Sequence, residues 1–157
     1  IPYPGANITS LRFEPEDYQD AVEKSNNQIT ISSFFNGNPD SEGGYSSVAT
    51  MKAVGDYVTY SFPVPVSGNF NFKLNYKLSK SSRGTARFSL VRSDGTEERL
   101  GSDIDESTNQ TEKMQTIDLG NHSIEAGTLK LRMRLVGGGI SGTGKLIGFN
   151  YLLLTRK

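Results

Sequence analysis

Residues 68–79 read GNFNFKLNYKLS, and apolar and polar side chains alternate through this stretch without a break. The apolar members are Phe70, Phe72, Leu74, Tyr76 and Leu78. A period of two residues places successive side chains on opposite faces of a β-strand. Because one face carries only apolar side chains, the stretch predicts a strand that buries this face against a second layer.

The same alternation returns in three other segments, which run from Val58 to Val64, Ala86 to Leu90 and Leu129 to Leu135. Short segments rich in Gly, Pro, Ser, Asn and Asp separate the runs, at 63–68, 81–84, 93–95, 120–121 and 126–127. Only 17–24 has the composition of a short helical turn. Many short strands with glycine-containing turns predict an all-β fold, an antiparallel β-sandwich or jelly roll of two packed sheets.

Length and composition limit the class of protein. A chain of 157 residues is long enough for one domain with a single core. It lacks cysteine, and no apolar run approaches the roughly 20 residues of a membrane span. Lys and Arg together equal Asp and Glu at 17 each, which argues against nucleic acid as a general partner. We therefore expect neither nucleic acid nor a membrane as a partner.

A glycine-rich segment near the end, GGGISGTGKL at 137–146, nearly matches the phosphate loop GxxxxGK[ST]. The last position of the motif, which needs a hydroxyl for magnesium, is Leu146. The motif also needs a following helix, whereas the remaining residues, IGFNYLLLTRK, favour a strand from Ile147 to Thr155. We interpret the segment as a loop between two strands, in which glycine permits mobility or close approach of the backbone.

Basic side chains occupy outward positions on two of the expected strands. Lys73 and Lys77 share the polar face of one strand, and Arg132 and Arg134 share that of another, together with Lys130. If the two strands were neighbours, they would form a basic face suited to an extended acidic chain. The alternative is that these residues serve only solubility and edge protection.

The opening segment LRFEPEDYQD, at 11–20, carries two glutamates separated by Pro15. In an extended chain Glu14 and Glu16 would point to the same side, where like charges repel unless a cation lies between them. Carboxylate oxygens are ligands that Ca²⁺ prefers, and Asn150 near the end could add an amide oxygen. A solvated acidic edge is the alternative.

Four segments together resemble the family 6 and family 35 carbohydrate-binding modules. They are EPEDY near the start, VGDYVTYSFPVPVSGNFNFKLNY in the middle, HSIEAGTLKLRMRLV later and FNYLLL at the end. The likeness covers nearly the whole chain and is weakest from Ser93 to Gln115. It implies a galactose-binding-like β-sandwich with one structural calcium ion and a sugar site in the loops at one end.

The resemblance also assigns residues to those sites. The calcium ligands of the family fall on Glu14, Glu16 and Asn150, where an amide replaces the usual aspartate and would hold calcium more weakly. The first sugar-binding aromatic falls on Tyr45. The second falls between Thr111 and Met114, where this chain has no aromatic residue.

The third position of the sugar site falls within the 137–145 loop, where Thr143 and Lys145 are the side-chain donors. Lys80 and Arg83, in another expected end loop, would lie near Tyr45 and Lys145 and would suit a carboxylate or a pyruvate ketal on a sugar. We therefore expect an acidic polysaccharide or oligosaccharide as ligand, with neutral glycans left open. The resemblance further implies that residues 1–157 are one module of a larger, secreted glycoside hydrolase or polysaccharide lyase, attached to a catalytic domain.

No residue pattern indicates catalysis in this chain. The single histidine, His122, follows a glycine and an asparagine in an expected surface turn. Asp103 and Asp105 lie in a polar loop that offers no apolar pocket to raise a pKa. We therefore expect a binding module and not an enzyme. A structural or protein-interaction sandwich remains the alternative, for which Tyr3, Tyr45 and the pair Phe34 and Phe35 are the candidate contact residues.

Overall fold

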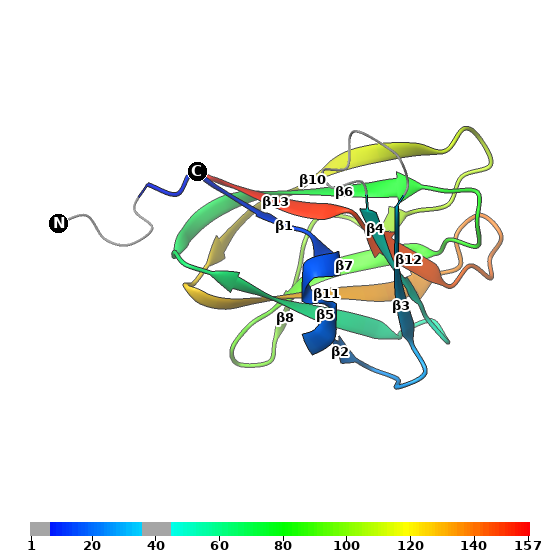
Figure 1. Cartoon of the computed structure of the whole chain (residues 1–157), viewed down its shortest axis with the longest axis horizontal. Helices are drawn as coiled ribbons and strands as arrows, with labels where there is room; N and C mark the ends of the chain where they lie inside the picture. Colours follow the sequence, from blue (N-terminus) through cyan, green and yellow to red (C-terminus); the bar gives the residue numbers. More distant parts are fainter. Residues whose placement is uncertain (1–6, 36–44) are drawn as a thin grey trace.

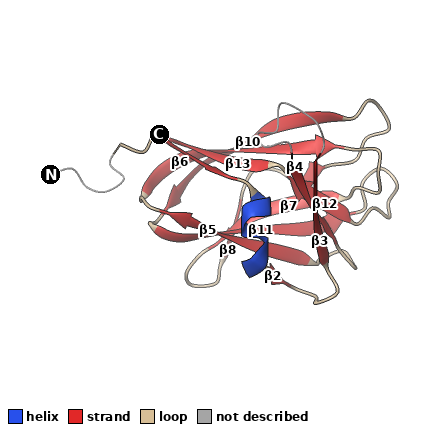
Figure 2. Ribbon diagram, viewed as in Figure 1, coloured by secondary structure: helices blue, strands red, loops and turns tan. Residues whose placement is uncertain are grey.

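The protein is built almost entirely of antiparallel β-strands, as its computed structural model shows (Figure 1 and Figure 2). The structure describes residues 7–35 and 45–157. Tyr3 and the side chains of Phe34, Phe35 and Tyr45 lie outside what it describes. Two large sheets form the layers, and a smaller third sheet stands beside them.

The first layer is a four-stranded sheet in the order β1-β13-β6-β10. Its strands are β1 Ser10–Phe13, β13 Tyr151–Arg156, β6 Gly68–Leu78 and β10 Lys113–Ile124. The alternating stretch that predicted a strand is β6, and Phe70, Phe72 and Leu74 on its inner face are fully buried. The predicted strand and its buried face are therefore confirmed.

The second layer is a six-stranded sheet in the order β2-β5-β11-β7-β8, with β9 also paired to β7. Its strands are β2 Glu23–Lys24, β5 Tyr57–Val64, β11 Gly127–Gly137, β7 Thr85–Val91, β8 Glu97–Arg99 and β9 Ile104–Asp105. The three other runs with a two-residue period are β5, β7 and β11, so these predictions are confirmed.

The closing strand differs from its prediction. It is divided into β12 Leu146–Phe149 and β13 Tyr151–Arg156, which belong to different sheets. β12 pairs with β4 Tyr45–Thr50, and β4 pairs with β3 Thr30–Phe35, forming a three-stranded sheet. The break falls at Asn150, whose backbone N–H donates to Asn75 O at 2.7 Å and whose Nδ2 donates to Asn75 Oδ1 at 2.7 Å. These bonds tie Asn150 to β6, so the chain leaves β4 and joins the four-stranded sheet.

Aromatic rings fill the space between the layers. Phe149 meets Tyr60 of β5 and Phe88 of β7 edge-on, at centroid distances of 5.4 and 5.7 Å. Phe13 of β1 stacks on Phe62 of β5 at 4.8 Å, which joins the edges of the two large sheets. A core of inward side chains from two facing antiparallel sheets defines a β-sandwich, as predicted.

The short helical turn expected at 17–24 is present with shifted bounds, whereas the turn expected at 120–121 is not a turn between strands. The helical segment is a 3-10 helix, η1 Pro15–Ala21, which begins at the proline, because proline fits the first position of a helix, where its missing N–H is not needed. The expected turn at 120–121 is a β-bulge inside β10, where Gly120 has a φ of 90° and the register shifts. His122 therefore lies in a strand and not in a surface turn.

The loops gather at the two ends of the sandwich. Those that join β6 to β7, β9 to β10 and β11 to β12 lie together at one end, on the right in Figure 1. The turns that join β5 to β6, β7 to β8 and β10 to β11 lie at the opposite end. We call the first group the end loops.

Candidate functional site

A cleft of about 310 Å³ opens where the three end loops meet. Five of its nine lining residues are serine or threonine, and the others are one asparagine, one lysine, one arginine and one isoleucine. The lining residues are Lys80, Ser81, Ser82, Arg83, Ser107, Thr108, Asn109, Ile140 and Ser141. A concave site rich in directed hydrogen-bonding groups suits a ligand that carries many hydroxyls.

Hydrogen bonds between the loops fix the shape of the cleft. The N–H groups of Lys145 and Leu146 both donate to Ser82 O, at 3.0 and 3.1 Å. Ile140 N donates to Ser107 Oγ at 2.8 Å, and Thr108 N donates to Ser79 O at 3.0 Å. Because each loop is tied to another one, the cleft is formed before any ligand arrives, which lowers the entropy cost of binding.

The glycines of the 137–145 loop are required by close packing. A Cβ on Gly144 would lie much closer to Arg83 O than van der Waals contact allows. A Cβ on Gly138 would likewise lie too close to Gly142 O. A Cβ on Gly139 would collide with Arg83 O and Ser107 Oγ. Of the two predicted roles for these glycines, close approach is the one that the structure shows, and it seats this loop on its neighbours.

Arg83 supports the cleft from beneath. Its side chain is 4% exposed, and its Nη1 donates to Glu106 Oε1 at 3.1 Å, while Glu106 itself is fully buried. Gly148 N donates to the same oxygen at 2.9 Å. Burial raises the pKa of Glu106 to about 8, although Arg83 and the Gly148 N–H oppose the shift. The guanidinium that the sequence assigned to a ligand is thus committed to a buried carboxyl group.

Lys80 is the exposed cation of the cleft. Its backbone N–H donates to Glu112 Oε2 at 2.8 Å, and Ser79 Oγ donates to the same oxygen at 2.7 Å. These bonds fix the backbone of Lys80, whereas its ammonium group has no ion pair within 7–35 and 45–157. Lys80 can therefore approach an anionic group on a ligand.

Thr143 and Lys145 lie beside the cleft and not in its lining. Both are exposed, and Thr143 Oγ1 lies 3.4 Å from Ser141 Oγ, a lining residue. Tyr45 begins β4, whose other end, Thr50, pairs with Leu146 next to Lys145. At a rise of about 3.3 Å per residue, the Tyr45 backbone lies roughly 16 Å along β4 from Thr50. The side chain of Tyr45 lies outside what the structure describes.

Sequence reasoning missed one of the three loops that line the cleft. Ser107, Thr108 and Asn109 come from the segment where the family resemblance is weakest, and their clustering in the run STNQT was the only available signal. Ile140 is 57% exposed and stands among the glycines at the rim. An exposed aliphatic side chain beside hydroxyls can pack against the C–H groups of a sugar ring.

The expected basic sheet face does not form. Lys73 and Lys77 lie on β6, in the four-stranded sheet, whereas Arg132 and Arg134 lie on β11, in the six-stranded sheet. The condition for a joint basic face, that the two strands be neighbours, is therefore not met, because they belong to different sheets. Arg132 and Arg134 also pair with Glu97 at 3.4 and 3.2 Å, which reduces the positive charge of their face.

The predicted calcium ligands come from opposite ends of the sequence, and the pairing of β1 with β13 brings these segments together: Glu14 follows Phe13, which pairs with Leu152, and Asn150 lies two residues before Leu152. Glu14 and Glu16 flank Pro15 at the start of η1, so they do not share one side of an extended segment. Burial, followed by the charge of Glu14, raises the pKa of Glu16. Glu16 Oε2 is buried without a hydrogen-bond partner among the described residues. An orphaned carboxylate oxygen beside a second carboxylate fits a cation site.

Asn150 offers less to a cation than the two glutamates. It is buried between β12 and β13, and its Nδ2 donates to Asn75 Oδ1 and lies 3.0 Å from Met114 Sδ. Within the described ranges no group of three or more His, Cys, Asp or Glu side chains could hold a metal ion. A calcium site here would therefore depend on Glu14, Glu16 and oxygens of other kinds.

Calcium is expected to stabilise the protein if Glu14 and Glu16 hold it. Millimolar CaCl₂ should raise the melting temperature by several degrees over protein treated with a chelator, because an ion that binds only the folded state adds its binding free energy to stability. In Glu16→Gln this calcium-dependent shift should disappear, while Glu23→Gln, at an exposed acid on β2, should keep it. A wild-type melting temperature that is the same with calcium and with chelator would refute the site.

Groups that could serve acid–base catalysis are engaged elsewhere. Asp103 accepts two hydrogen bonds from Arg87, at 2.9 and 3.0 Å, and these bonds lower the pKa of Asp103. His122 Nδ1 lies 3.0 Å from Glu98 Oε1, and its Nε2 lies 2.8 Å from Leu119 O. Neither group lines the cleft between the end loops.

Comparison with solved structures identifies the class of fold. The chain superposes on part of a xanthan lyase from Paenibacillus with a TM-score of 0.76 and 20% identity, covering 99% of this chain and 14% of the lyase. A family 35 carbohydrate-binding module from Clostridium thermocellum matches with a TM-score of 0.55 and 14% identity, over 96% of this chain and 100% of the module. A family 6 module from Cellvibrio mixtus lichenase 5A, solved with cellotriose, matches with a TM-score of 0.54 and 14% identity, over 96% of this chain and 99% of the module.

No family model and no curated protein sequence matches the chain. The structural matches show that the protein has the β-sandwich fold of carbohydrate-binding modules. This confirms the fold that the resemblance to families 6 and 35 implied. No helix among the described residues is long and apolar enough to span a membrane.

Proposed function

We propose that this chain is a non-catalytic carbohydrate-binding module that holds an acidic polysaccharide in the cleft between the end loops. The observation that carries the proposal is the cleft itself, which is preformed, is lined by hydroxyls and an amide, and carries the exposed Lys80. Its position at one end of a fold shared with sugar-binding modules supports the same function.

The chemistry of the lining indicates how a sugar would bind. Ser82, Thr108 and Asn109 provide donors and acceptors for hydroxyl groups, and the side chain of Ile140 offers an apolar surface to ring C–H groups. Lys80 would pair with a uronate or pyruvate carboxylate. Lys145 and Thr143, at the edge of the cleft, would contact the next sugar along the chain, and Tyr45 is proposed as an additional aromatic contact.

The setting of the module is also part of the proposal. One structural match, the xanthan lyase, is a much longer protein, of which this chain spans 14%. A second match, a mannanase from Podospora anserina that includes a family 35 module, is spanned to 28%. We infer that the chain serves a secreted glycan-degrading enzyme by keeping an attached catalytic domain close to its polysaccharide, which raises the effective substrate concentration.

Lys80→Ala is expected to weaken binding of an acidic polysaccharide about three- to tenfold and to reduce its dependence on salt, because an exposed ion pair contributes modestly and is screened. Affinity electrophoresis and calorimetry should be run against xanthan, pectate and alginate, with neutral glucan and mannan for comparison. Lys24→Ala removes an exposed lysine of β2 that does not line the cleft, and this variant should bind as the wild type does.

Three outcomes decide between the possible sites. If the wild type binds none of these polysaccharides, the sugar-binding function is wrong, and a structural or protein-interaction role takes its place. If Tyr45→Ala and Lys80→Ala each lower the affinity for the same polysaccharide, the two residues contribute to one ligand site. Binding that survives Lys80→Ala and Ser82→Leu unchanged would place the ligand outside the end loops.

A further inference from the structure

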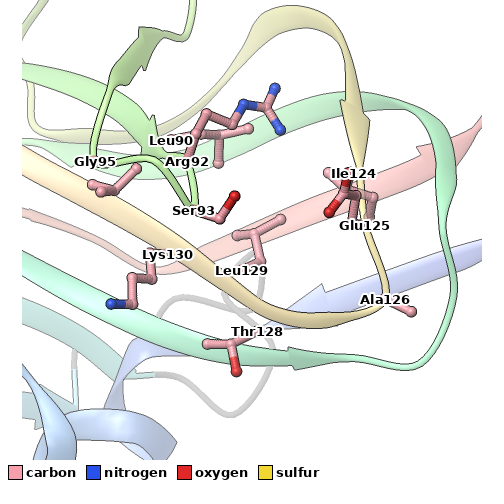
Figure 3. Close-up of a pocket in the computed structure, with 11 residues that line it drawn as sticks. Leu90, Arg92, Ser93, Gly95, Ile124, Glu125, Ala126, Thr128, Leu129 and Lys130 are labelled. Atoms are coloured by element: carbon pink, nitrogen blue, oxygen red, sulfur yellow. The ribbon is translucent and has the colours of Figure 1, made fainter.

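A larger cleft, of about 480 Å³, opens at the end of the sandwich opposite the end loops (Figure 3). It lies between the turn that joins β7 to β8 and the turn that joins β10 to β11. Its floor consists of Leu90, Ile124 and Leu129, which are at most 6% exposed. This size is within the roughly 300–1,000 Å³ of small-molecule sites.

One wall of this cleft is held in place by a hydrogen-bond network. Arg92 Nη1 donates to Ser123 O at 2.8 Å, and its Nη2 donates to Glu98 Oε2. The other oxygen of Glu98 lies 3.0 Å from His122 Nδ1. The two bonds of Arg92 use two of the five N–H groups of a guanidinium, so oriented donors remain for a ligand.

The rim carries polar groups of every kind. Ser93 and Glu125 stand on opposite sides of the cleft with Leu129 between them (Figure 3). The hydroxyl of Ser93, the carboxylate of Glu125 and the ammonium of Lys130 have no hydrogen-bond or ion-pair partner among the described residues. The rim therefore offers a donor, an acceptor and a hydroxyl that can do both.

The charged groups around this cleft do not favour an anion. Arg92 is neutralised by Glu98, and Lys130 is matched by Glu125 across the rim. An anionic ligand would gain little here, because two carboxylates oppose the two cations. A purely apolar ligand would cover the leucines and the isoleucine but would bury polar groups without partners.

We propose that this cleft is a second carbohydrate site, which takes one or two rings of an uncharged sugar. Ring C–H groups would pack on Leu129 and Ile124, while hydroxyl groups would donate to Glu125 and accept from Arg92 and Lys130. The inference does not depend on the cleft between the end loops, because it concerns another end of the fold and another class of sugar. A module with both sites could hold two polysaccharide segments at once.

Matched serine substitutions test the proposal. Ser93→Leu fills the second cleft, Ser82→Leu fills the cleft between the end loops, and Ser102→Leu, at an exposed serine that lines neither, is the control. Cellotriose, mannotriose and xylotriose should be titrated into ¹⁵N-labelled protein. At least one should shift the amide signals of Ser93, Gly95 and Leu129 in the wild type, in Ser82→Leu and in Ser102→Leu. In Ser93→Leu the dissociation constant should rise at least about tenfold.

The outcomes separate the two sites. If all three trisaccharides leave those amide signals unmoved, or if Ser93→Leu binds as tightly as Ser102→Leu, the second site is refuted. If a trisaccharide shifts only signals around Ser82 and Ile140, the second site is likewise refuted, while the proposed function of the end loops stands. Loss of acidic polysaccharide binding in Ser82→Leu, with trisaccharide shifts retained at Leu129, supports both proposals independently.

Discussion

Arg83→Met is expected to destabilise the protein more than any other single substitution of a charged residue described above. Breaking a buried ion pair leaves its partner without compensation, which typically costs about 3–5 kcal/mol. Here the partner is Glu106, which is fully buried and also accepts the Gly148 N–H at 2.9 Å. Urea denaturation at about pH 9, where Glu106 of the wild type is ionised, should show this loss as a lower midpoint with an unchanged slope.

The size of the effect should depend on pH. The pKa of Glu106 is raised to about 8 from an ordinary value of 4.5, so the folded protein retains a proton that the unfolded chain releases. The stabilisation from this proton is complete below the unfolded value and is lost as the pH rises through the folded value. Wild-type stability should therefore fall between about pH 5 and pH 8 relative to Glu106→Gln, whose amide does not titrate.

The same proton reduces the penalty of Arg83→Met in acid. When Glu106 is neutral, the substitution removes only hydrogen bonds, and the loss should shrink to about 1–3 kcal/mol. The double substitution Arg83→Met with Glu106→Gln should recover most of the loss at high pH, because the amide oxygen still accepts from Gly148. Arg87→Met breaks a partly exposed pair with Asp103 and should cost about 0–1 kcal/mol. Equal effects of Arg83→Met and Arg87→Met would show that the buried pair has no special importance.

Gly144→Ala is expected to have the second largest effect, on stability and binding together. The new Cβ would collide with Arg83 O, a backbone atom that cannot turn aside. Overpacking of this kind costs about 1–3 kcal/mol. Relief of the collision would separate the 137–145 loop from Ser82, so the affinity for acidic polysaccharide should fall as well.

A neighbouring glycine provides the control. Gly142 has a φ of 78°, and nothing lies within 4 Å of a Cβ placed on it. Asparagine tolerates this left-handed conformation, so Gly142→Asn should change stability by less than about 1 kcal/mol. Thermal and urea unfolding with a binding assay will compare the two variants. A Gly144→Ala protein as stable as Gly142→Asn would mean that the loop is not seated as the structure shows.

Alternation alone was sufficient to predict the main strands of this fold and their buried faces. β5, β6, β7 and β11 each bury one face, and the period of two residues makes such strands visible in a sequence. The division of the closing strand could not be predicted in this way. It depends on bonds between Asn150 and Asn75, which lie far apart in the sequence. The bulge at Gly120 was interpreted as a turn because glycine occurs in both.

Sequence reasoning found two of the three loops that form the candidate site. Lys80, Arg83 and the 137–145 loop were assigned to one end of the sandwich, and the structure brings these loops together. The sequence could not distinguish exposed Lys80 from buried Arg83, because the difference depends on Glu106, a residue of a third loop. The contribution of residues 107–109 to the cleft was missed for the same reason. Loop residues have no regular alternation of apolar and polar side chains, so their sequence does not indicate which residues they contact in space.

The pairing of the first and last strands has a mechanical consequence. β1 and β13 are antiparallel neighbours, and Ser10 faces Thr155 at the edge of the four-stranded sheet. Tension applied through the two ends of the chain would load the bonds between them one at a time, as when a zipper is opened, and not all at once in shear. β1 would peel away first and carry Phe13 out of its stack with Phe62, while β6 and the end loops stay folded. A module tethered at both ends could thus lengthen under load while its ligand cleft stays intact.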